Sequence, residues 1–379
     1  QHLAICLLSI NGLSTNRREM RKCIYITDDG WWDTDITILP QIVNDYEITV
    51  VVAENINQLK YYEKNISGVQ DIVRFETKYS NKNFRKIVKS ISFFSSIYRK
   101  YIKAKTPPLI FFIKENNIAF LLLSLFLLPK RHTIIGIHDF LIHKGRYSSF
   151  YDFLFKLLYE RFENFLFFSE TQFRSFNRSY PTKRSFYINM PLKSFGIITR
   201  ATHKVGYRKF LFFGFIQDYK RLDLFINAAK QIDNARFIIA GACKEWEKYK
   251  KIIGQMDNLQ CDIHFLNNDE IRSYFQEADY LVLPYDESTQ SGPLLIAYNY
   301  NIPVIASDIE LFKTMVCDEQ NGFLFEKGNL GSLIKILDKA NNLSESQYQL
   351  LVKNMSERKE QYQLTTNFKL ALDTFLGKR

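Results

Sequence analysis

The chain has 379 residues, of which 46% are hydrophobic and 15% aromatic, and its formal net charge is +11. A single hydrophobic core rarely grows to this size, so two domains are expected, and the apolar content excludes a disordered chain. The five cysteines are scattered and never in a C-x-x-C spacing, which argues against a disulfide framework or a zinc site and fits a reducing compartment.

Short β-rich apolar runs alternate with amphipathic stretches along the whole chain. In the first half the strand candidates are Leu3–Ile10, Ile48–Val52, Leu109–Ile113, Thr133–His138 and Asn164–Ser169. In the second half they are Lys209–Gly214, Arg236–Ala240, Ile263–Leu266, Tyr280–Pro284, Pro303–Ala306 and Gly322–Phe325. Strand–helix alternation of this kind predicts parallel, doubly wound sheets, and these are too many strands for one sheet.

The domain boundaries follow from where the periodicity fails. Residues 181–206 show neither a helical nor a strand period, and the linker is placed at 191–206. This predicts a Rossmann-like domain over 1–190, a second over 207–345, and strand-free helices over 346–379 that pack back on the first domain. Two such domains leave a cleft between the carboxyl ends of their strands, where open α/β sheets bind ligands.

Two apolar segments raise the question of a membrane. HLAICLLSI, near the first residue, is short and lacks a basic leader, so we interpret it as a buried strand and not as a signal peptide. The run Ile118–Pro129 has about half the length that a bilayer span needs, and a buried helix is expected there. The sequence predicts a protein that does not cross a membrane.

The positive charge is concentrated in two acid-free stretches. Asn81–Lys105 has eight Lys or Arg, and its apolar residues recur at three- and four-residue spacing, which predicts a basic amphipathic helix. This helix either rests on anionic lipid or is a solvated face whose apolar stripe lies in the core. The second stretch, Thr171–Gln217, has nine basic residues. No nucleic-acid-binding pattern accompanies either one, so an anionic small molecule or a lipid phosphate is the simpler partner.

One loop of the second domain has a glycine and a lysine that suit an anion. In KFLFFGFIQDYKRLDLF a buried strand stops at Gly214, Lys220 follows in the loop, and a helix begins near Leu222. A glycine lets a ligand approach the backbone and a lysine neutralises phosphate, although a tight turn and a surface lysine would explain the same residues. The pattern is neither G-x-G-x-x-G nor a P-loop, so nicotinamide and Walker-type sites are not supported.

A second loop, DESTQSGPLLIA, stands between a strand and the next helix. Its polar residues are Ser288, Thr289, Gln290 and Ser291. At a helix start, free backbone N–H groups and the helix dipole favour an anion, and Gly292 leaves room for close approach. A plain cap needs one hydroxyl, so this run of polar residues favours a phosphate site.

Four segments, in the same order and strand context, resemble a known family. The residues Gly214–Lys220, DEIRSYFQEADYLVLPY, TQSGPLLIAYNYNIPVIASD and NGFLFEKGN are similar to the donor half of GT-B glycosyltransferases, of the bacterial family 4 type with TQSG in this loop. The resemblance covers about Lys209–Asp338 and extends more loosely to IGIHDFLIHKG in the first domain. It implies the GT-B fold, which has two tandem Rossmann-like α/β domains facing a cleft, followed by C-terminal helices.

By position, the resemblance implies residues that bind a nucleotide-sugar donor. They are Gly214, Leu266, Asn267, Asn268, Ser288, Thr289, Gln290, Ser291 and Gly292. The catalytic candidates are Lys220, on the diphosphate, and His138, which would project from the first domain towards the sugar and phosphates. A lone histidine ending a strand is often structural, but Asp139 and His143 follow on the same loop and favour a function. No third metal ligand is placed there by the sequence.

Five positions depart from the family pattern. Many family 4 enzymes carry two glutamates eight positions apart, where this chain has Ser288 and Ile296. A usual arginine is Phe215, a common glycine is Arg221, and a later glutamate is Thr314. The TQSG subgroup also lacks the paired acids, so their absence does not by itself indicate an inactive protein.

The stretch TDDGWWDTD, early in the first domain, is a candidate acceptor site. Its residues are Asp28, Asp29, Trp31, Trp32 and Asp33. Tryptophans can stack on a sugar face while carboxylates bond to hydroxyls; the alternative is a surface loop with the tryptophans packed inward. Residues 33–35 form a D-x-D pair. In glycosyltransferases of a different fold such a pair holds a metal-bound sugar nucleotide, but about one D-x-D pair is expected by chance in a chain of this composition.

The resemblance implies a hexosyltransferase that uses no metal and no cofactor beyond its substrate, a UDP- or GDP-sugar. A lysine and a helix N-terminus can stabilise the leaving diphosphate. Retention would let that phosphate accept the acceptor proton on one face of the sugar. Inversion would need a base, for which Asp28, Asp29 and Asp139 are candidates.

The implied setting is bacterial surface polysaccharide synthesis, with a glycan or a lipid-linked glycan as acceptor. The protein would be cytoplasmic, with possible peripheral contact at the inner face of the plasma membrane and no nucleic-acid partner. The alternative is a non-catalytic GT-B protein that binds a sugar nucleotide or acts as a scaffold, which the missing acid pair supports.

Overall fold

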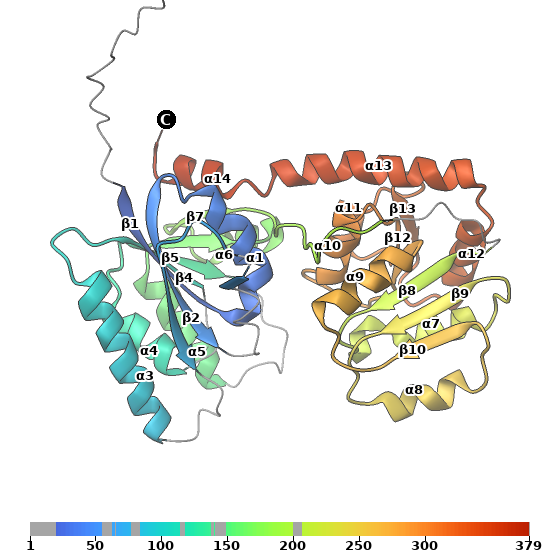
Figure 1. The fold of residues 1–379 in the computed structure, drawn as a ribbon, viewed down its shortest axis with the longest axis horizontal. Coiled ribbons are helices and arrows are strands. Elements are labelled where there is room, and N and C mark those ends of the chain that lie inside the picture. Colours follow the sequence, from blue (N-terminus) through green and yellow to red (C-terminus); the bar gives the residue numbers. More distant parts are fainter. Residues whose placement is uncertain are drawn as a thin grey trace, which may run out of the picture. The chain divides into compact units, whose positions relative to one another are not determined.

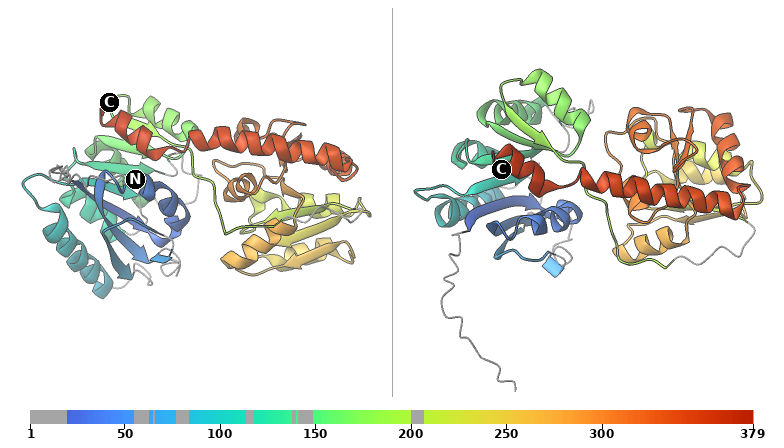
Figure 2. Two further views of the ribbon diagram at one scale, coloured as in Figure 1. Left: turned by 45° about the horizontal axis from the view of Figure 1, so that its top comes forward. Right: turned by 90° about the horizontal axis from the view of Figure 1, so that it is seen from above.

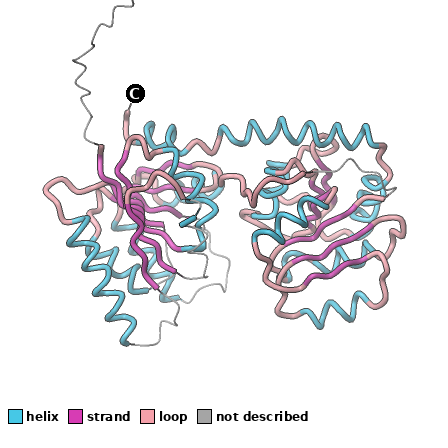
Figure 3. The backbone as a smooth tube through the Cα atoms, viewed as in Figure 1, coloured by secondary structure: helices cyan, strands magenta, loops and turns pink. Residues whose placement is uncertain are grey.

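The structure is a computed structural model with two parallel sheets, one of seven strands and one of six, each flanked by helices (Figure 1). It describes residues 20–54, 63–64, 66–76, 84–113, 118–137, 140, 149–199 and 207–378. This confirms the predicted α/β class with two doubly wound sheets. Figure 3 shows the strands of each sheet running side by side between helices.

The first sheet has the order β3-β2-β1-β4-β5-β6-β7. Its strands are β1 Arg21–Asp28, β2 Tyr46–Glu54, β3 Asp71–Glu76, β4 Leu109–Ile113, β5 Thr133–Ile137, β6 Asn164–Phe167 and β7 Arg184–Tyr187. The inner strand β1 pairs in parallel with β2 and β4, and the chain reverses its direction of winding between β3 and β4. In such a sheet, loops at the carboxyl ends of strands beside the reversal are where ligands bind.

The helices around this sheet are short. They are α1 Trp32–Ile38, α3 Phe84–Ile97, α4 Ile118–Leu127, α5 Ser149–Arg161 and α6 Glu170–Ser179, with the short helices η1 Asp29–Trp31, η2 Leu39–Gln41 and η3 Tyr98–Ile102. Helices α3 and α5 both pack against α4. No helix in the described part of the chain is long and apolar enough to cross a bilayer.

The second sheet has the order β10-β9-β8-β11-β12-β13. Its strands are β8 Lys209–Phe213, β9 Arg236–Ala240, β10 Leu259–Asp262, β11 Tyr280–Leu283, β12 Val304–Ser307 and β13 Gly322–Phe325. Because β8 and β11 are neighbours, the loops that follow them leave the same edge of the sheet. The N–H of Asp286 donates to the carbonyl of Tyr219 at 2.8 Å, which joins these two loops directly.

Nine further helical segments follow the strands of the second sheet among the described residues. They are η4 Asp218–Lys220, α7 Leu222–Ala229, α8 Trp246–Ile253, α9 Asn268–Glu277, α10 Gly292–Asn299, α11 Glu310–Met315, α12 Leu330–Asn341, α13 Glu345–Leu364 and α14 Phe368–Phe375. Helix α13 begins with a capping box between Ser344 and Gln347, and it forms one long rod in both views of Figure 2. Helix α14 packs on β7, where the rings of Phe186 and Phe375 lie 4.6 Å apart.

Tertiary contacts divide the chain into two compact units. The smaller contains Leu39–Ile135 and Ser149–Asn164, together with the residues up to Trp32. The larger contains Asp33–Ile38 and Phe165–Arg379, and so holds the second sheet and the C-terminal helices. The cavity and the ion pair described below lie within the larger unit.

Some of the strand predictions differ from the structure. The strand predicted at Ile263–Leu266 is wrong, because the edge strand β10 is Leu259–Asp262, paired with β9. An edge strand is only half buried and lacks a continuous apolar run. The apolar pattern therefore favoured the residues that follow β10 as the predicted strand. Segment 181–206 was predicted to have no regular element, but it contains β7. The strand predicted at Leu3–Ile10 lies outside the described residues.

Candidate functional site

At the start of α10, a backbone N–H has no acceptor among the described residues. Ser291 is the N-cap, and the N–H of Leu294 donates to its hydroxyl at 3.4 Å. Pro293 has no N–H to satisfy. Within the described part of the chain, no group accepts a hydrogen bond from the N–H of Gly292. Capping by Ser291 therefore accounts for one amide and leaves the Gly292 amide for another acceptor.

The polar residues just before α10 hold the loop in place. The hydroxyl of Ser288 donates to the carbonyl of Gln290 at 2.7 Å. The amide of Gln290 donates in turn to the carbonyl of Phe168 at 2.8 Å, at the end of β6. These contacts fix the loop against the turn between β6 and α6.

Lys220 lies buried next to the first turn of α10. Its side chain is 7% exposed, and its Nζ lies 5.4 Å from the ring centroid of Tyr285. Among the described residues, none forms an ion pair or a hydrogen bond with this Nζ. Burial lowers the pKa of Lys220 to about 8. A buried ammonium without an anionic partner is costly in the empty protein, which a bound anion would offset.

Gly214 makes room for this lysine. It directly follows β8 and has a φ of 106°, a backbone conformation that residues with a side chain rarely adopt. A Cβ added there would lie 3.3 Å from Nζ of Lys220 and 3.5 Å from Cγ of Pro293. The Lys220 ammonium and the first turn of α10 therefore both lie within contact distance of the Cβ position of Gly214.

Arg221 ties the two loops together. It adopts a left-handed backbone conformation with a φ of 52°, at the position where the resembled family has a glycine. Its guanidinium donates to Asp223 at 2.9 Å and to Asp286 at 3.2 Å. Because Asp286 opens the loop before α10, these ion pairs fix that loop relative to Lys220.

A second lysine approaches the same helix start. A Cβ added to Gly292 would lie 3.8 Å from Nζ of Lys193, which forms an ion pair with Asp33. Lys193 follows the first sheet in an irregular segment, and Asp33 belongs to the first turn of α1. Of the five predicted acceptor residues, Asp33 is linked to the start of α10 through this ion pair with Lys193.

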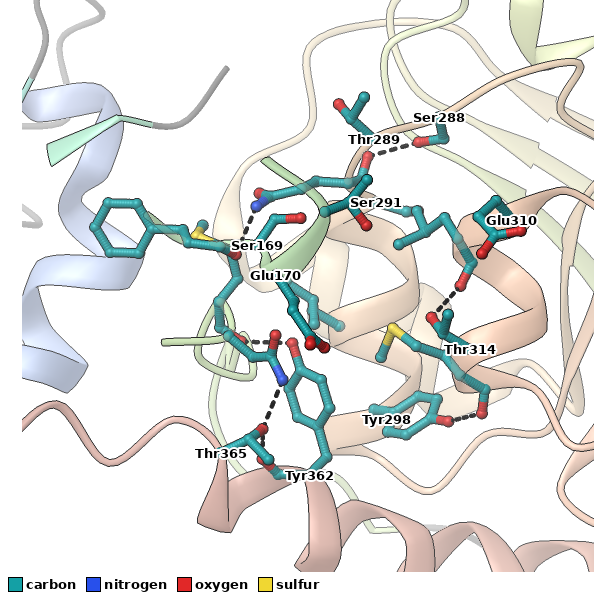
Figure 4. Close-up of a pocket in the computed structure, with 18 of the residues that line it drawn as sticks. Ser169, Glu170, Ser288, Thr289, Ser291, Tyr298, Glu310, Thr314, Tyr362 and Thr365 are labelled. Atoms are coloured by element: carbon teal, nitrogen blue, oxygen red, sulfur yellow. Dashed lines mark hydrogen bonds between the residues drawn. The ribbon is translucent and has the colours of Figure 1, made fainter. Parts of the chain in front are cut away.

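A cavity of about 340 Å³ opens beside Ser291, within the usual range for small-molecule pockets (Figure 4). It is lined by Phe168, Ser169, Glu170, Thr171, Asn189, Met190, Ser288, Thr289, Gln290, Ser291, Leu295, Tyr298, Glu310, Leu311, Thr314, Met315, Arg358, Gln361, Tyr362 and Thr365. Figure 4 shows Glu170 and Glu310 entering from different sides, on α6 and α11. Glu170 accepts from Arg174, and Arg358 donates to the carbonyl of Thr314.

The remaining donor candidates are placed as follows. Leu266 is buried, and Asn267 is the N-cap of α9, where it forms a capping box with Glu270. Asn268 is the first residue of that helix, so this segment offers mainly backbone atoms to a ligand. The loop with His138, Asp139 and His143 lies outside the described residues.

The five predicted acceptor residues have different surroundings. Asp28 accepts from the N–H of Gly30 at 2.7 Å, and burial, opposed by that hydrogen bond, raises its pKa to about 6. Asp29 and Trp32 are almost completely buried, so neither presents its side chain to an acceptor in this structure. Trp31 remains partly exposed, and Asp33 is the partner of Lys193.

The positions that depart from the family pattern are also resolved. Ile296, a residue of α10, is buried, with 3% of its surface exposed. Thr314 lines the cavity, but its hydroxyl donates to the carbonyl of Leu311. Phe215 is exposed. Within the described ranges, no three His, Cys, Asp or Glu residues are grouped closely enough to hold a metal ion.

Sequence reasoning missed Lys193, Glu170 and Glu310. Glu170 follows β6 closely, so its position after a strand was a usable signal. Glu310 follows β12 in the same way. Lys193 gave no such signal, because its segment has no regular period.

The match to a known family falls on the second sheet. Residues 207–340 match the family Glycosyl transferases group 1. No curated protein matches the chain by sequence.

Solved structures extend the likeness to both sheets. Anabaena HepE, in complex with UDP and glucose, is 12% identical with a TM-score of 0.70, over 94% of this chain and 100% of that one. Sucrose-phosphate synthase from Thermosynechococcus elongatus is 13% identical with a TM-score of 0.66, over 93% and 97%. WaaG, a glycosyltransferase involved in lipopolysaccharide biosynthesis, is 12% identical with a TM-score of 0.63, over 94% and 100%. The chain has the GT-B fold.

Proposed function

We propose that this glycosyltransferase moves a hexose from a nucleotide sugar to a glycan or lipid-linked glycan. The observation that carries the proposal is the buried ammonium of Lys220, which has no anionic partner among the described residues and lies beside the first turn of α10. A helix N-terminus and a lysine together favour a phosphate. The cavity beside Ser291 provides space next to them for the sugar.

In the proposed reaction, the bond between the sugar and the diphosphate breaks as the acceptor oxygen attacks the sugar. Lys220 and the Gly292 amide stabilise the negative charge that develops on the leaving diphosphate. These groups take the part that a divalent metal would otherwise have, and no cofactor besides the donor is proposed. Transfer that stops when EDTA is added, and returns with a divalent cation, would contradict this part.

We further propose that transfer retains the configuration of the sugar. The leaving phosphate would accept the acceptor proton on the same face, so no protein carboxylate has to act as nucleophile or base. The linkage made from an α-linked donor, read by NMR, decides the point. A β-linked product would show inversion and would direct attention to Asp28 as a base.

The sugar itself is proposed to bind in the cavity, with Thr289 and Gln290 on one side. Ser288 and Ile296 stand where many family 4 enzymes have acids, but Glu170 and Glu310 bring two carboxylates into this cavity. Carboxylates accept hydrogen bonds from sugar hydroxyls. Replacing either by Gln is expected to lower kcat/KM for the donor about tenfold without changing the affinity for the free nucleotide.

The nucleoside of the donor is proposed to be uridine or guanosine. HepE, whose fold this chain shares, binds UDP and UDP-glucose according to its structures, so UDP-sugars are the first to test. A thermal-shift comparison of UDP, GDP, ADP and CMP ranks the bases, because a ligand that binds only the folded protein raises its melting temperature. A larger shift with ADP or CMP would contradict this assignment.

A place in bacterial surface polysaccharide synthesis, with peripheral contact at the inner face of the membrane, is part of the proposal. On α3 the side chains of Val88 and Ile91 are exposed beside Lys89, while Phe94 and Ile97 are buried. Exposed apolar residues next to cations favour anionic lipid. Equal sedimentation with vesicles containing phosphatidylglycerol and with purely zwitterionic vesicles would contradict this contact.

A non-catalytic sugar-nucleotide-binding protein is the second candidate. The observation in its favour is that Ile296, at a position where relatives carry an acid, is buried in the core. Slow hydrolysis of a bound UDP- or GDP-sugar supports the enzyme. Tight nucleotide binding without hydrolysis or transfer to any lipid-linked acceptor supports the binding protein.

Lys220→Met tests the main proposal. We expect nucleotide affinity to fall by about a hundredfold, because the charge-assisted contact of this ammonium with phosphate is lost. The variant should also be roughly 1–3 kcal/mol more stable, since it removes the cost of burying an ammonium. Lys209→Met is the control, because Lys209 pairs with Glu277 at the amino end of β8. Unchanged nucleotide affinity in Lys220→Met would overturn the proposal.

A further inference from the structure

The side chain of Lys193 lies beside Gly292, the first residue of α10. The position of a Cβ on Gly292 is 3.8 Å from Nζ and 3.9 Å from Cε of Lys193. The N–H of the same Gly292 has no acceptor among the described residues. An oxygen that approaches this amide from that side therefore comes within reach of the Lys193 ammonium.

In the empty protein, the ammonium of Lys193 is paired with the carboxylate of Asp33. The two side chains form an ion pair, with Lys193 20% and Asp33 13% exposed. The hydroxyl of Thr34 also donates to Asp33 at 3.3 Å. The pair is thus partly screened by solvent, and the contact between its members is weaker than that of a fully buried pair.

The charges at this helix start are too few for a diphosphate. Lys220 provides one positive charge, and a helix N-terminus acts as about half a charge more. A nucleoside diphosphate, which is the leaving group of the proposed transfer, carries between two and three negative charges near neutral pH. Lys193 is the nearest further cation that the structure places against Gly292.

We propose that Lys193 is a second phosphate-binding residue, held beside Gly292 by Asp33 until the donor diphosphate takes its place as the partner. The inference rests on the proposed function, because it assigns another contact of the same donor. Lys193 binds the diphosphate directly, and Asp33 is a positioning residue that competes with it. In the absence of the donor, the ion pair with Asp33 keeps the Lys193 ammonium in position beside Gly292.

A purely structural ion pair makes a different prediction. If the pair only holds the segment around Lys193 to α1, then losing either member has the same consequence for stability and for binding. If Lys193 serves the diphosphate, the two members act in opposite directions. Removing Lys193 takes away a phosphate contact, whereas removing the charge of Asp33 takes away a competitor and a negative charge near the phosphate.

The test is calorimetric titration of the full chain with UDP, and with GDP in parallel. Lys193→Gln is expected to bind the preferred nucleotide about tenfold more weakly, and its affinity should depend less steeply on salt. Asp33→Asn is expected to bind it more tightly, by about twofold to fivefold. Lys193→Arg keeps the charge and should recover part of the loss, which separates a charge effect from a folding defect.

The matched control is the pair Lys209–Glu277, whose Nζ and Oε2 lie 3.0 Å apart at the amino end of β8. Lys209→Gln and Glu277→Gln change the same charges and should leave nucleotide affinity unchanged. Wild-type affinity in Lys193→Gln, or weakening of equal size in Lys193→Gln and Asp33→Asn, would overturn this inference alone. A wild-type protein that binds neither nucleotide would overturn the proposed function itself.

Discussion

The corner after β11 and the corner after β1 are both rich in polar residues, but they use them in opposite ways. After β1, the acids are engaged within the protein: Asp28 caps the next turn, Asp29 is buried, and Asp33 pairs with Lys193. After β11, hydrogen bonds of Ser288 and Gln290 hold the loop, and the amide of Gly292 is left without an acceptor among the described residues. The ammonium of Lys220, which also has no partner among them, comes to this corner from the loop after β8.

The difference shows that the number of polar residues is a poor guide to a binding site. A polar side chain that already has a protein partner can bind a ligand only by giving up or sharing that contact, as we propose for Lys193. A buried donor without a partner has a desolvation cost that a ligand can remove. On this criterion the α10 corner is the better binding site, and three variants or conditions test the contrast.

The largest effect is expected from Gly292→Ala. The added Cβ has room in the empty protein, because its nearest neighbour is Lys193 Nζ at 3.8 Å, so stability should be unchanged or slightly higher. It would stand where a phosphate oxygen approaches, and nucleotide affinity should fall by about tenfold to a hundredfold in calorimetric titration. Gly331→Ala, in the first turn of α12, is the control with no expected effect on binding. A Gly292→Ala protein that binds as wild type would remove the α10 corner from the site.

The next effect is a dependence of nucleotide affinity on pH. Burial lowers the pKa of Lys220 to about 8 in the empty protein, so the ammonium is lost as the pH rises through this value. If the bound phosphate requires the ammonium, affinity should be about tenfold weaker at pH 9 than at pH 7. Lys220→Met should lack this decrease. Titrations at both pH values check this, and a flat profile in the wild type would show that the charge of Lys220 is not used.

The smallest effect concerns the β1 corner. Because the folded-state pKa of Asp28 is raised to about 6, above its unfolded value, its ionised form destabilises the folded protein, and stability falls as the pH rises towards 6. Asp28→Asn keeps the cap without the charge, so it should gain roughly 1–2 kcal/mol at pH 7.5 and nothing near pH 3.5.

Urea denaturation at the two pH values measures this gain, with Asp233→Asn as an exposed control. Nucleotide affinity should not change in Asp28→Asn. A loss of affinity as large as that of Gly292→Ala would mean that the two corners do not differ as described.

Much of the second sheet was predictable from the sequence. Arg236–Ala240 and Gly322–Phe325 coincide with β9 and β13, because buried parallel strands are short apolar runs bounded by turn residues. The edge strand β10 was placed too late, since an edge strand lacks this pattern. In the first sheet β1, β3 and β7 were not predicted, although β1 is an inner strand.

The candidate site divides in the same way. Lys220, Ser291 and Gly292 could be named in advance, because each follows a strand closely, and a residue at that position is carried to the ligand-binding edge of the sheet. Nothing near Lys193 in the sequence pointed to Gly292, and nothing near Asp33 pointed to Lys193. Burial of Asp29 and Trp32 was equally hidden, because it depends on what packs over them.

The sequence by itself determined the alternation of strands and helices and the loop that starts α10, because these depend on short-range patterns of apolar, polar and turn-forming residues. The GT-B class came from the resemblance of four segments to a known family. Only the tertiary structure decided which polar groups remain available to a ligand. That property depends on partners distant in the chain, such as Asp33 for Lys193 and Tyr285 beneath Lys220, and such partners are set by how the elements pack.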